Sequence, residues 1–115
     1  MTPSLPEADG EGRAIMVVGF DWQGITLSVT YEPDWLGRGE RGAVHATAHL
    51  TITAIAPERA RLPVTETGYR SHFLAQGEVE AADGPEAYVR EWLDFMAQSR
   101  EWKRYEQESR QYTLF

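Results

Sequence analysis

The 115-residue chain contains no cysteine and only three histidines. The absence of cysteine excludes disulfides, thiolate metal ligands and cysteine nucleophiles, and it fits a cytoplasmic compartment. No apolar run approaches the roughly 20 residues that a membrane-spanning helix needs, and the first residues lack the charged and then apolar pattern of a signal peptide. We therefore expect no association with a membrane.

Basic residues are also scarce. Eleven Lys and Arg residues stand against 18 Asp and Glu residues, which gives a formal net charge of -7. This balance argues against direct binding of nucleic-acid phosphates, and it suits a basic protein partner such as a nucleic-acid-binding complex. The length and the 42% hydrophobic content predict a single domain with one core.

The first half of the chain has the patterns of β-strands. Residues 1–13 are rich in Pro, Gly and acidic side chains, so we expect a disordered tail there. β-branched and aromatic residues over 14–22 and strict alternation over 25–32 predict two strands, which Gln23-Gly24 joins as a hairpin. Residues 44–55 alternate as the longest strand, with small and branched side chains on one face and His and Thr on the other.

The second half has the patterns of helices. Asp83 followed by Glu86 resembles a capping box, which predicts a helix start near Asp83. The apolar face of this helix comprises Val89, Trp92, Leu93 and Met96. Ser99 is a candidate cap for a second helix through about Ser109, with a narrow apolar stripe at Trp102 and Tyr105.

Strands followed by helices predict an α+β domain over residues 14–110. Its antiparallel sheet of three to four strands, within residues 14–74, would be covered on one face by one or two C-terminal helices within residues 83–109. The exposed edges of such a sheet also permit a homodimer.

The segment Leu62–Leu74 joins the two halves and carries the densest polar chemistry. Val64, Tyr69, Phe73 and Leu74 are expected to face the core. Glu66, Thr67, Arg70 and His72 form a candidate site for a small anion or an enzyme reaction, with Arg70 as the bidentate element. The alternative is a turn whose polar side chains bond their own backbone.

Other arrangements of catalytic or metal-binding residues have less support. Ser71 and His72 are adjacent in a strand and point to opposite faces, so they are not expected to form a nucleophile pair. His45 and His49 lie roughly 13 Å apart along a strand, too far to share a metal. One of them could meet His72 or Glu66 across the sheet, but no spacing signature supports this site. We predict no metal, no cofactor and no catalytic residues.

The segment Leu62–Leu74, the Gly84-Pro85 helix start and a Gln-x-x-Leu-Phe ending together resemble a set of small bacterial proteins associated with plasmids and other mobile elements. The resemblance covers about the C-terminal half of the chain. It implies a mobile-element setting and no particular activity.

Residues 111–115 resemble the linear motif by which bacterial replication and repair proteins dock on the DNA polymerase sliding clamp. In that motif a glutamine precedes two variable residues and an apolar pair, here Gln111, Leu114 and Phe115. The apolar pair would fill a hydrophobic pocket while the glutamine bonds backbone groups at its rim. Alternatively, Leu114 and Phe115 pack back over the helices.

The leading hypothesis is a non-enzymatic protein-interaction module that engages DNA-handling machinery, with the sliding clamp as its first candidate partner. A second hypothesis is an inhibitor of a host defence complex, of the anti-CRISPR or anti-restriction kind, that uses an acidic surface. The third is the small-anion binder or enzyme built on Glu66, Thr67, Arg70 and His72.

Overall fold

A computed structural model describes residues 15–33 and 46–112 of the chain, with side chains through Arg110. Three features predicted above lie wholly or partly outside these residues: the tail over residues 1–13, the long strand at Val44 and His45, and the C-terminal motif at Leu114 and Phe115. The predictions made for them remain predictions.

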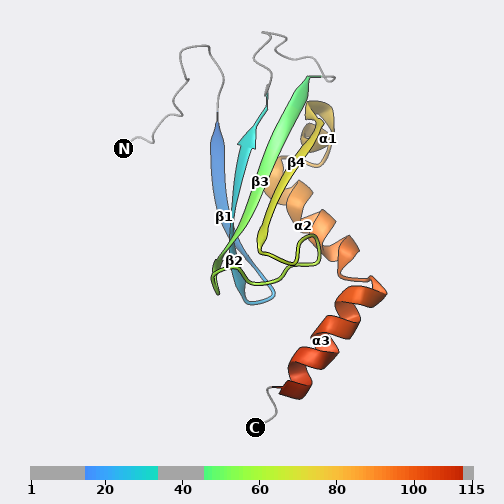
Figure 1. Cartoon of the computed structure of the whole chain (residues 1–115). Helices are drawn as coiled ribbons and strands as arrows, with labels where there is room; N and C mark the ends of the chain where they lie inside the picture. Colours follow the sequence, from blue (N-terminus) through green and yellow to red (C-terminus); the bar gives the residue numbers. More distant parts are fainter. Residues whose placement is uncertain (1–14, 34–45, 113–115) are drawn as a thin grey trace.

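The described part of the chain contains a four-stranded antiparallel sheet in the order β1-β2-β3-β4 (Figure 1). The strands are β1 (Met16–Trp22), β2 (Ile25–Glu32), β3 (Thr47–Ala56) and β4 (Tyr69–Ala75). Gln23 and Gly24 join β1 to β2 with φ angles of 48° and 83°. Two consecutive positive φ angles match the twist of the flanking strands, so the predicted hairpin is confirmed.

Alternation along β2 and β3 separates a buried face from an open face. Leu50 and Ile52 of β3 are fully buried, and they pair with Tyr31 and Val29 of β2, which are also buried. Thr51 and Thr53 point to the other face, which we call the open face, and they are only partly buried. The period of two read from the sequence therefore assigned the side chains correctly.

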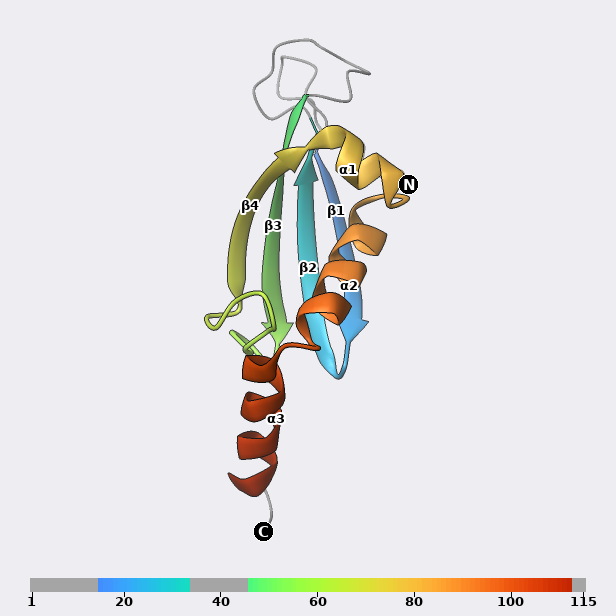
Figure 2. The ribbon, with the colours of Figure 1, turned by 90° about the vertical axis from the view of Figure 1, so that its right-hand side faces the viewer.

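Three helices follow the sheet: α1 (Gln76–Ala81), α2 (Pro85–Met96) and α3 (Arg100–Tyr112). Figure 2 shows α1 and α2 lying across one face of the sheet. Val89 and Leu93 of α2 are fully buried there, in the same core cluster as the small side chains of Ala48 and Ala54 in β3. The α+β fold with helices on one face is thus as predicted.

Two details of the helices differ from the sequence-based expectation. The six-residue α1 was not predicted, because a helix this short shows no clear hydrophobic period. The buried Val79 is its main contact with the core. Helix α2 begins at Pro85 after Gly84, and Asp83 adopts a φ of 74° without capping the helix through its side chain. Glu86 pairs instead with Arg90 at 2.9 Å, so the predicted capping box is wrong.

Helix α3 projects beyond the end of the sheet (Figures 1 and 2). Ser99 caps it as predicted, because its Oγ accepts a hydrogen bond from the Trp102 amide at 3.1 Å. Trp102 is buried against Trp22, and Tyr105 packs on Trp102. This narrow apolar stripe attaches α3 at its base. The helix ends at Tyr112, three residues beyond the expected end.

The prediction that Tyr69 and Phe73 face the core is wrong. Their side chains are 53% and 54% exposed on the open face of β4. Cross-strand pairing with Thr53 and His49 places them there, since paired residues share a face. Leu74 packs against the core as expected, and Val64 is buried in the connection that precedes β4.

Candidate functional site

The connection between β3 and β4, residues 57–68, contains a tight turn over residues 62–65 that is held by its own backbone. The amide and carbonyl groups of Leu62 and Thr65 bond each other in both directions, at 2.8 and 3.0 Å. Leu62 and Val64 are buried and fix the turn to the core. The polar residues that follow therefore start from a rigid base.

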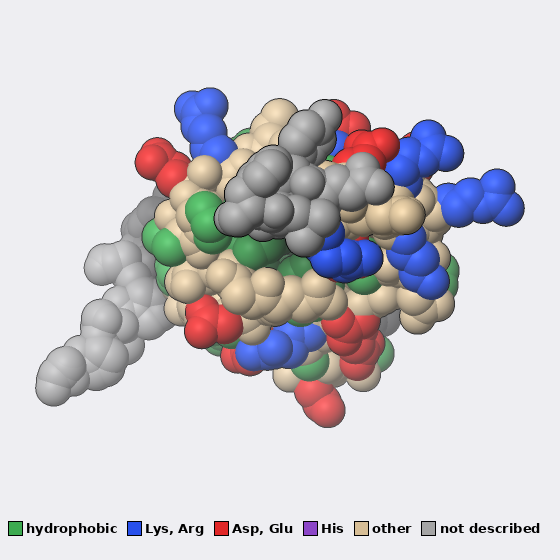
Figure 3. All heavy atoms as spheres, turned by 90° about the horizontal axis from the view of Figure 1, so that it is seen from below, with side chains coloured by type: hydrophobic (Ala, Val, Ile, Leu, Met, Phe, Trp, Pro, Cys, Tyr) green, Lys and Arg blue, Asp and Glu red, His purple; other side chains and the backbone are tan. Residues whose placement is uncertain are grey.

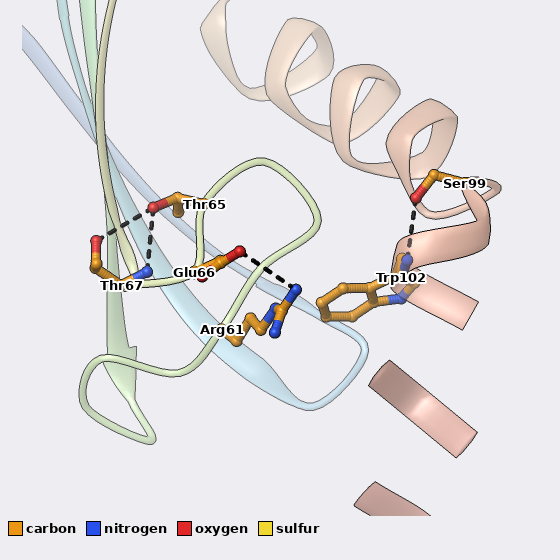
Figure 4. Close-up of polar contacts among 6 residues, drawn as sticks. All are labelled: Arg61, Thr65, Glu66, Thr67, Ser99 and Trp102. Atoms are coloured by element: carbon orange, nitrogen blue, oxygen red, sulfur yellow. Dashed lines mark hydrogen bonds and ion pairs between the residues drawn. The ribbon is translucent and has the colours of Figure 1, made fainter. Parts of the chain in front are cut away.

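Glu66 and Thr67 directly follow this turn and are mostly engaged locally (Figure 4). Glu66 forms an ion pair with Arg61 at 3.7 Å, although its side chain remains 79% exposed. The Oγ1 atoms of Thr65 and Thr67 both donate to the carbonyl oxygen of Tyr69, at 2.8 and 3.3 Å. This arrangement has the local side-chain bonding expected of the alternative, a self-satisfied turn.

A polar cavity of about 160 Å³ separates this turn from the first turn of α3. The indole of Trp102 extends from α3 toward Arg61 beside it (Figure 4). Glu66 lines this cavity, whereas Thr67 lines a different one next to Gly68. The two residues therefore do not share a binding space.

Arg70 and His72 lie on the helix-covered side of β4, against Trp92 of α2. The Arg70 guanidinium donates to the Val64 carbonyl at 2.9 Å and lies 5.3 Å from the centre of the Trp92 ring. The His72 ring lies 4.5 Å from the same indole. The structure thus does not bring the four predicted site residues together. Glu66 and Thr67 follow the turn and line different cavities, whereas Arg70 and His72 both pack on Trp92.

Partial burial lowers the pKa of His72 below its ordinary value of 6.5, and the neighbouring Arg70 and the more distant His49 lower it further, while Glu78 acts in the opposite direction. The unfolded chain therefore binds a proton more readily than the folded chain in the window just below pH 6.5. The contribution of His72 to the free energy of unfolding should be fully present above that window and should be lost as the pH falls through it.

We expect His72→Phe to retain the ring contact with Trp92 and to flatten this acid-side loss. Urea unfolding of both proteins between about pH 5 and pH 8 measures the effect. An equally steep decline in the variant would show that another group carries the proton.

A second cluster of polar side chains spans three strands on the open face. His49 of β3 lies between Glu32 of β2 and Ser71 of β4. Its Nδ1 is 3.1 Å from the Glu32 carboxylate, and its Nε2 is 2.6 Å from the Ser71 hydroxyl. We refer to these three residues as the Glu32–His49–Ser71 array.

The hydrogen bonds of the array define the tautomer of the neutral imidazole. An ionised carboxylate only accepts, so Nδ1 carries the hydrogen and donates to Glu32. Nε2 is then an acceptor for the Ser71 hydroxyl. The side chains of His49 and Glu32 are only 12% and 18% exposed, whereas Ser71 is exposed to solvent.

Sequence reasoning missed this array because its members are far apart in the chain. The adjacent pair Ser71 and His72 was correctly rejected, since the two side chains point to opposite faces. The partner of Ser71 is His49, which only the register of β3 against β4 reveals. The sequence did contain one signal for it: alternate residues of the predicted strands, including Glu32 and Thr51, are polar and therefore lie on the same face of the sheet.

Among residues 15–33 and 46–112, no group of three His, Asp or Glu side chains is arranged to hold a metal ion. None of the helices in these segments is both long and apolar enough to cross a membrane. Gln111 lies in the last turn of α3. Its motif partners Leu114 and Phe115 lie outside the described residues.

The family model of the KlcB third domain matches residues 16–102. The chain belongs to this family. The match agrees with a plasmid-associated module and covers the sheet, α1, α2 and the first turn of α3. It includes the Glu32–His49–Ser71 array and the segment Leu62–Leu74, but residues 111–115 lie beyond it. No curated protein and no solved structure matches the chain.

Proposed function

We propose that this KlcB third domain is a protein-interaction module that docks on DNA-handling machinery through Gln111, Leu114 and Phe115. The bacterial sliding clamp is the leading candidate partner. The observation that carries the proposal is the projection of α3 beyond the sheet (Figure 2). Trp102 and Tyr105 anchor the helix near its base, and the helix extends beyond the end of the sheet. The proposal requires that a partner reach the end of α3 without displacing the fold.

The position of Gln111 in the last turn of α3 is compatible with this docking mode. The final carbonyl groups of a helix have no partners within the helix, and helix ends fray readily. Unwinding the last turn into an extended segment therefore costs little. An apolar pair that enters a hydrophobic pocket can supply most of the binding energy.

The test is calorimetric titration of the whole chain into a purified bacterial sliding clamp. We expect Leu114→Ala combined with Phe115→Ala to weaken binding at least about 30-fold, which corresponds to a loss of about 2 kcal/mol. Thr113→Ala, at a variable position of the motif, is the matched control and should bind like the parent. The proposal also requires the melting temperatures of all three proteins to agree, because a motif that is available to a partner does not hold the fold together.

Two results would contradict the proposal. Clamp binding that survives deletion of residues 111–115 would place the contact elsewhere. A complete absence of binding by the parent chain would remove the clamp as a partner.

An acidic inhibitor of a defence complex is the second candidate. The net charge of -7 supports it. Against it, Lys and Arg side chains are interspersed with Asp and Glu over the face shown in Figure 3, where a nucleic-acid mimic would gather one sign of charge. We therefore rank it below clamp docking. The anion-binding or enzyme hypothesis on Glu66, Thr67, Arg70 and His72 ranks third, because the structure does not bring these residues together.

A further inference from the structure

The hydrogen-bond order of the Glu32–His49–Ser71 array is the one that activates a serine nucleophile. A carboxylate holds Nδ1 of an imidazole, and Nε2 faces a hydroxyl oxygen at 2.6 Å. In such an arrangement the imidazole acts as a general base for the hydroxyl, and the carboxylate fixes the tautomer and stabilises the imidazolium that forms. We propose that Ser71 is an activated nucleophile of an acyl-transfer site.

The array rests on a rigid support. Its three residues come from three adjacent strands of one sheet. Glu32 lies directly opposite His49, and Ser71 lies directly opposite Thr51. Ring contact with Phe73, at 4.5 Å between centroids, further restricts His49. A site built on paired strands holds its geometry better than one built on loops.

The backbone of β4 adds a donor next to the nucleophile. The amide of Gln76 bonds the carbonyl of Ala46, and the carbonyl of Gly68 accepts from the amide of Ala54. In an antiparallel ladder every second residue faces the same neighbour, so the even-numbered residues of β4 bond β3. The N–H of Ser71 therefore points to the outer edge of the sheet, where it can stabilise the oxyanion of an attacked carbonyl.

The side chains that flank Ser71 suggest the substrate class. Tyr69 and Phe73 lie two residues to either side of it, on the same face and about half exposed. Aromatic surfaces at this position suit an apolar or aromatic acyl group. We infer an ester of such an acid as the substrate class.

The reaction balances without a cofactor. Ser71 Oγ attacks the acyl carbon while its proton moves to His49 Nε2, and the carbonyl becomes a tetrahedral oxyanion. Collapse of this intermediate breaks the bond to the leaving alkoxide, which takes the proton from His49. Water then attacks the acyl carbon while its proton moves to His49 Nε2. The bond to Ser71 Oγ breaks, Ser71 takes this proton back, and the free acid is released.

This inference goes beyond the proposed docking function and does not depend on it. The array lies on the open face and within the family match, whereas the docking motif follows at the end of α3. Failure of clamp binding would not contradict the proposal for Ser71, and an unreactive Ser71 would not contradict the proposal for clamp binding.

The experiment treats the whole chain with an alkyl fluorophosphonate and locates the adduct by peptide mass spectrometry. Attack by Ser71 Oγ on phosphorus expels fluoride, so the reagent reports an activated hydroxyl directly. Ser28 is the internal control, because it lies on the same sheet face opposite Gly19 and Thr53. We expect Ser71 to react at least about 100-fold faster than Ser28, in line with the effect of a positioned general base.

Variants then test the roles of the other two residues. His49→Gln should reduce the Ser71 labelling rate by about 100-fold, and Glu32→Gln should also reduce it. Hydrolysis of p-nitrophenyl benzoate should fall in the same order, while Ser28→Ala retains the parent rate. Equal labelling of Ser71 and Ser28 in the parent chain would overturn the proposal, and this comparison requires no variant to fold. Labelling that is unchanged in a folded His49→Gln variant would overturn it as well.

Discussion

Gly68→Ala is expected to lower the free energy of unfolding by roughly 2–5 kcal/mol, the sum of a left-handed backbone and a steric clash. Gly68 is buried and has a φ of 80°. A Cβ atom there would lie 2.6 Å from the Arg59 Cα and 3.0 Å from the Ala60 carbonyl oxygen. Backbone atoms cannot rotate away as a side chain can, so the turn between β3 and β4 would have to shift.

Gly24→Ala provides the matched control. Gly24 has nearly the same φ, 83°, but a Cβ atom there would meet nothing within 4 Å. We expect it to cost only the backbone strain, about 1–2 kcal/mol. Chemical denaturation of the parent and both variants measures the difference. Equal losses in the two variants would mean that the approach of Gly68 to Arg59 is not tight in solution.

Leu93→Ala should have an effect of similar size, a loss of about 2–5 kcal/mol. Leu93 is fully buried where α2 crosses the sheet, within the cluster that includes Val29 and Ile52. Truncation removes apolar contact and leaves a cavity that strands fixed by their ladders cannot close. Helix α2 would then hold the sheet less firmly.

Phe95→Ala is the control for this position. Phe95 lies two residues along the same helix, is larger than Leu93, and is 70% exposed. Its removal should change stability by no more than about 0.5 kcal/mol. Thermal or urea unfolding compares the two variants. A larger loss for Phe95→Ala than for Leu93→Ala would show that α2 packs on the sheet through a different face.

The two proposed functions use separate parts of the molecule. The proposed docking motif lies at the end of α3, which Trp102 and Tyr105 anchor near its base. The Glu32–His49–Ser71 array lies on the open face of the sheet, opposite α1 and α2. Under the two proposals, the module binds a partner at the end of α3, and the site at Ser71 reacts independently of that partner.

Several elements could be predicted because their signals are local. The hairpin at Gln23-Gly24 follows from a glycine between two alternating runs, and Ser99 is a helix cap by its side chain and position. The assignment of Leu50 and Ile52 to the core and of Thr51 and Thr53 to the open face needed only the period of a strand.

Predictions failed where an element was short or where a strand lay at an edge. Helix α1 has six residues, too few for a periodic pattern. Tyr69 and Phe73 are large and apolar, which favours burial, but β4 is an edge strand of the described sheet and its register against β3 places both side chains on the open face. Its polar Arg70 and His72 are instead accommodated on the covered side by the face of Trp92.

The sequence by itself determined the α+β architecture, the order of strands before helices, and the faces of β2 and β3, because each depends on residues close together in the chain. Only the tertiary structure decided which polar side chains meet. Glu32, His49 and Ser71 come together through the register of three strands, and register is set by the packing of the whole buried face. The same packing separated Glu66 and Thr67 from Arg70 and His72, although these four residues are neighbours in the chain.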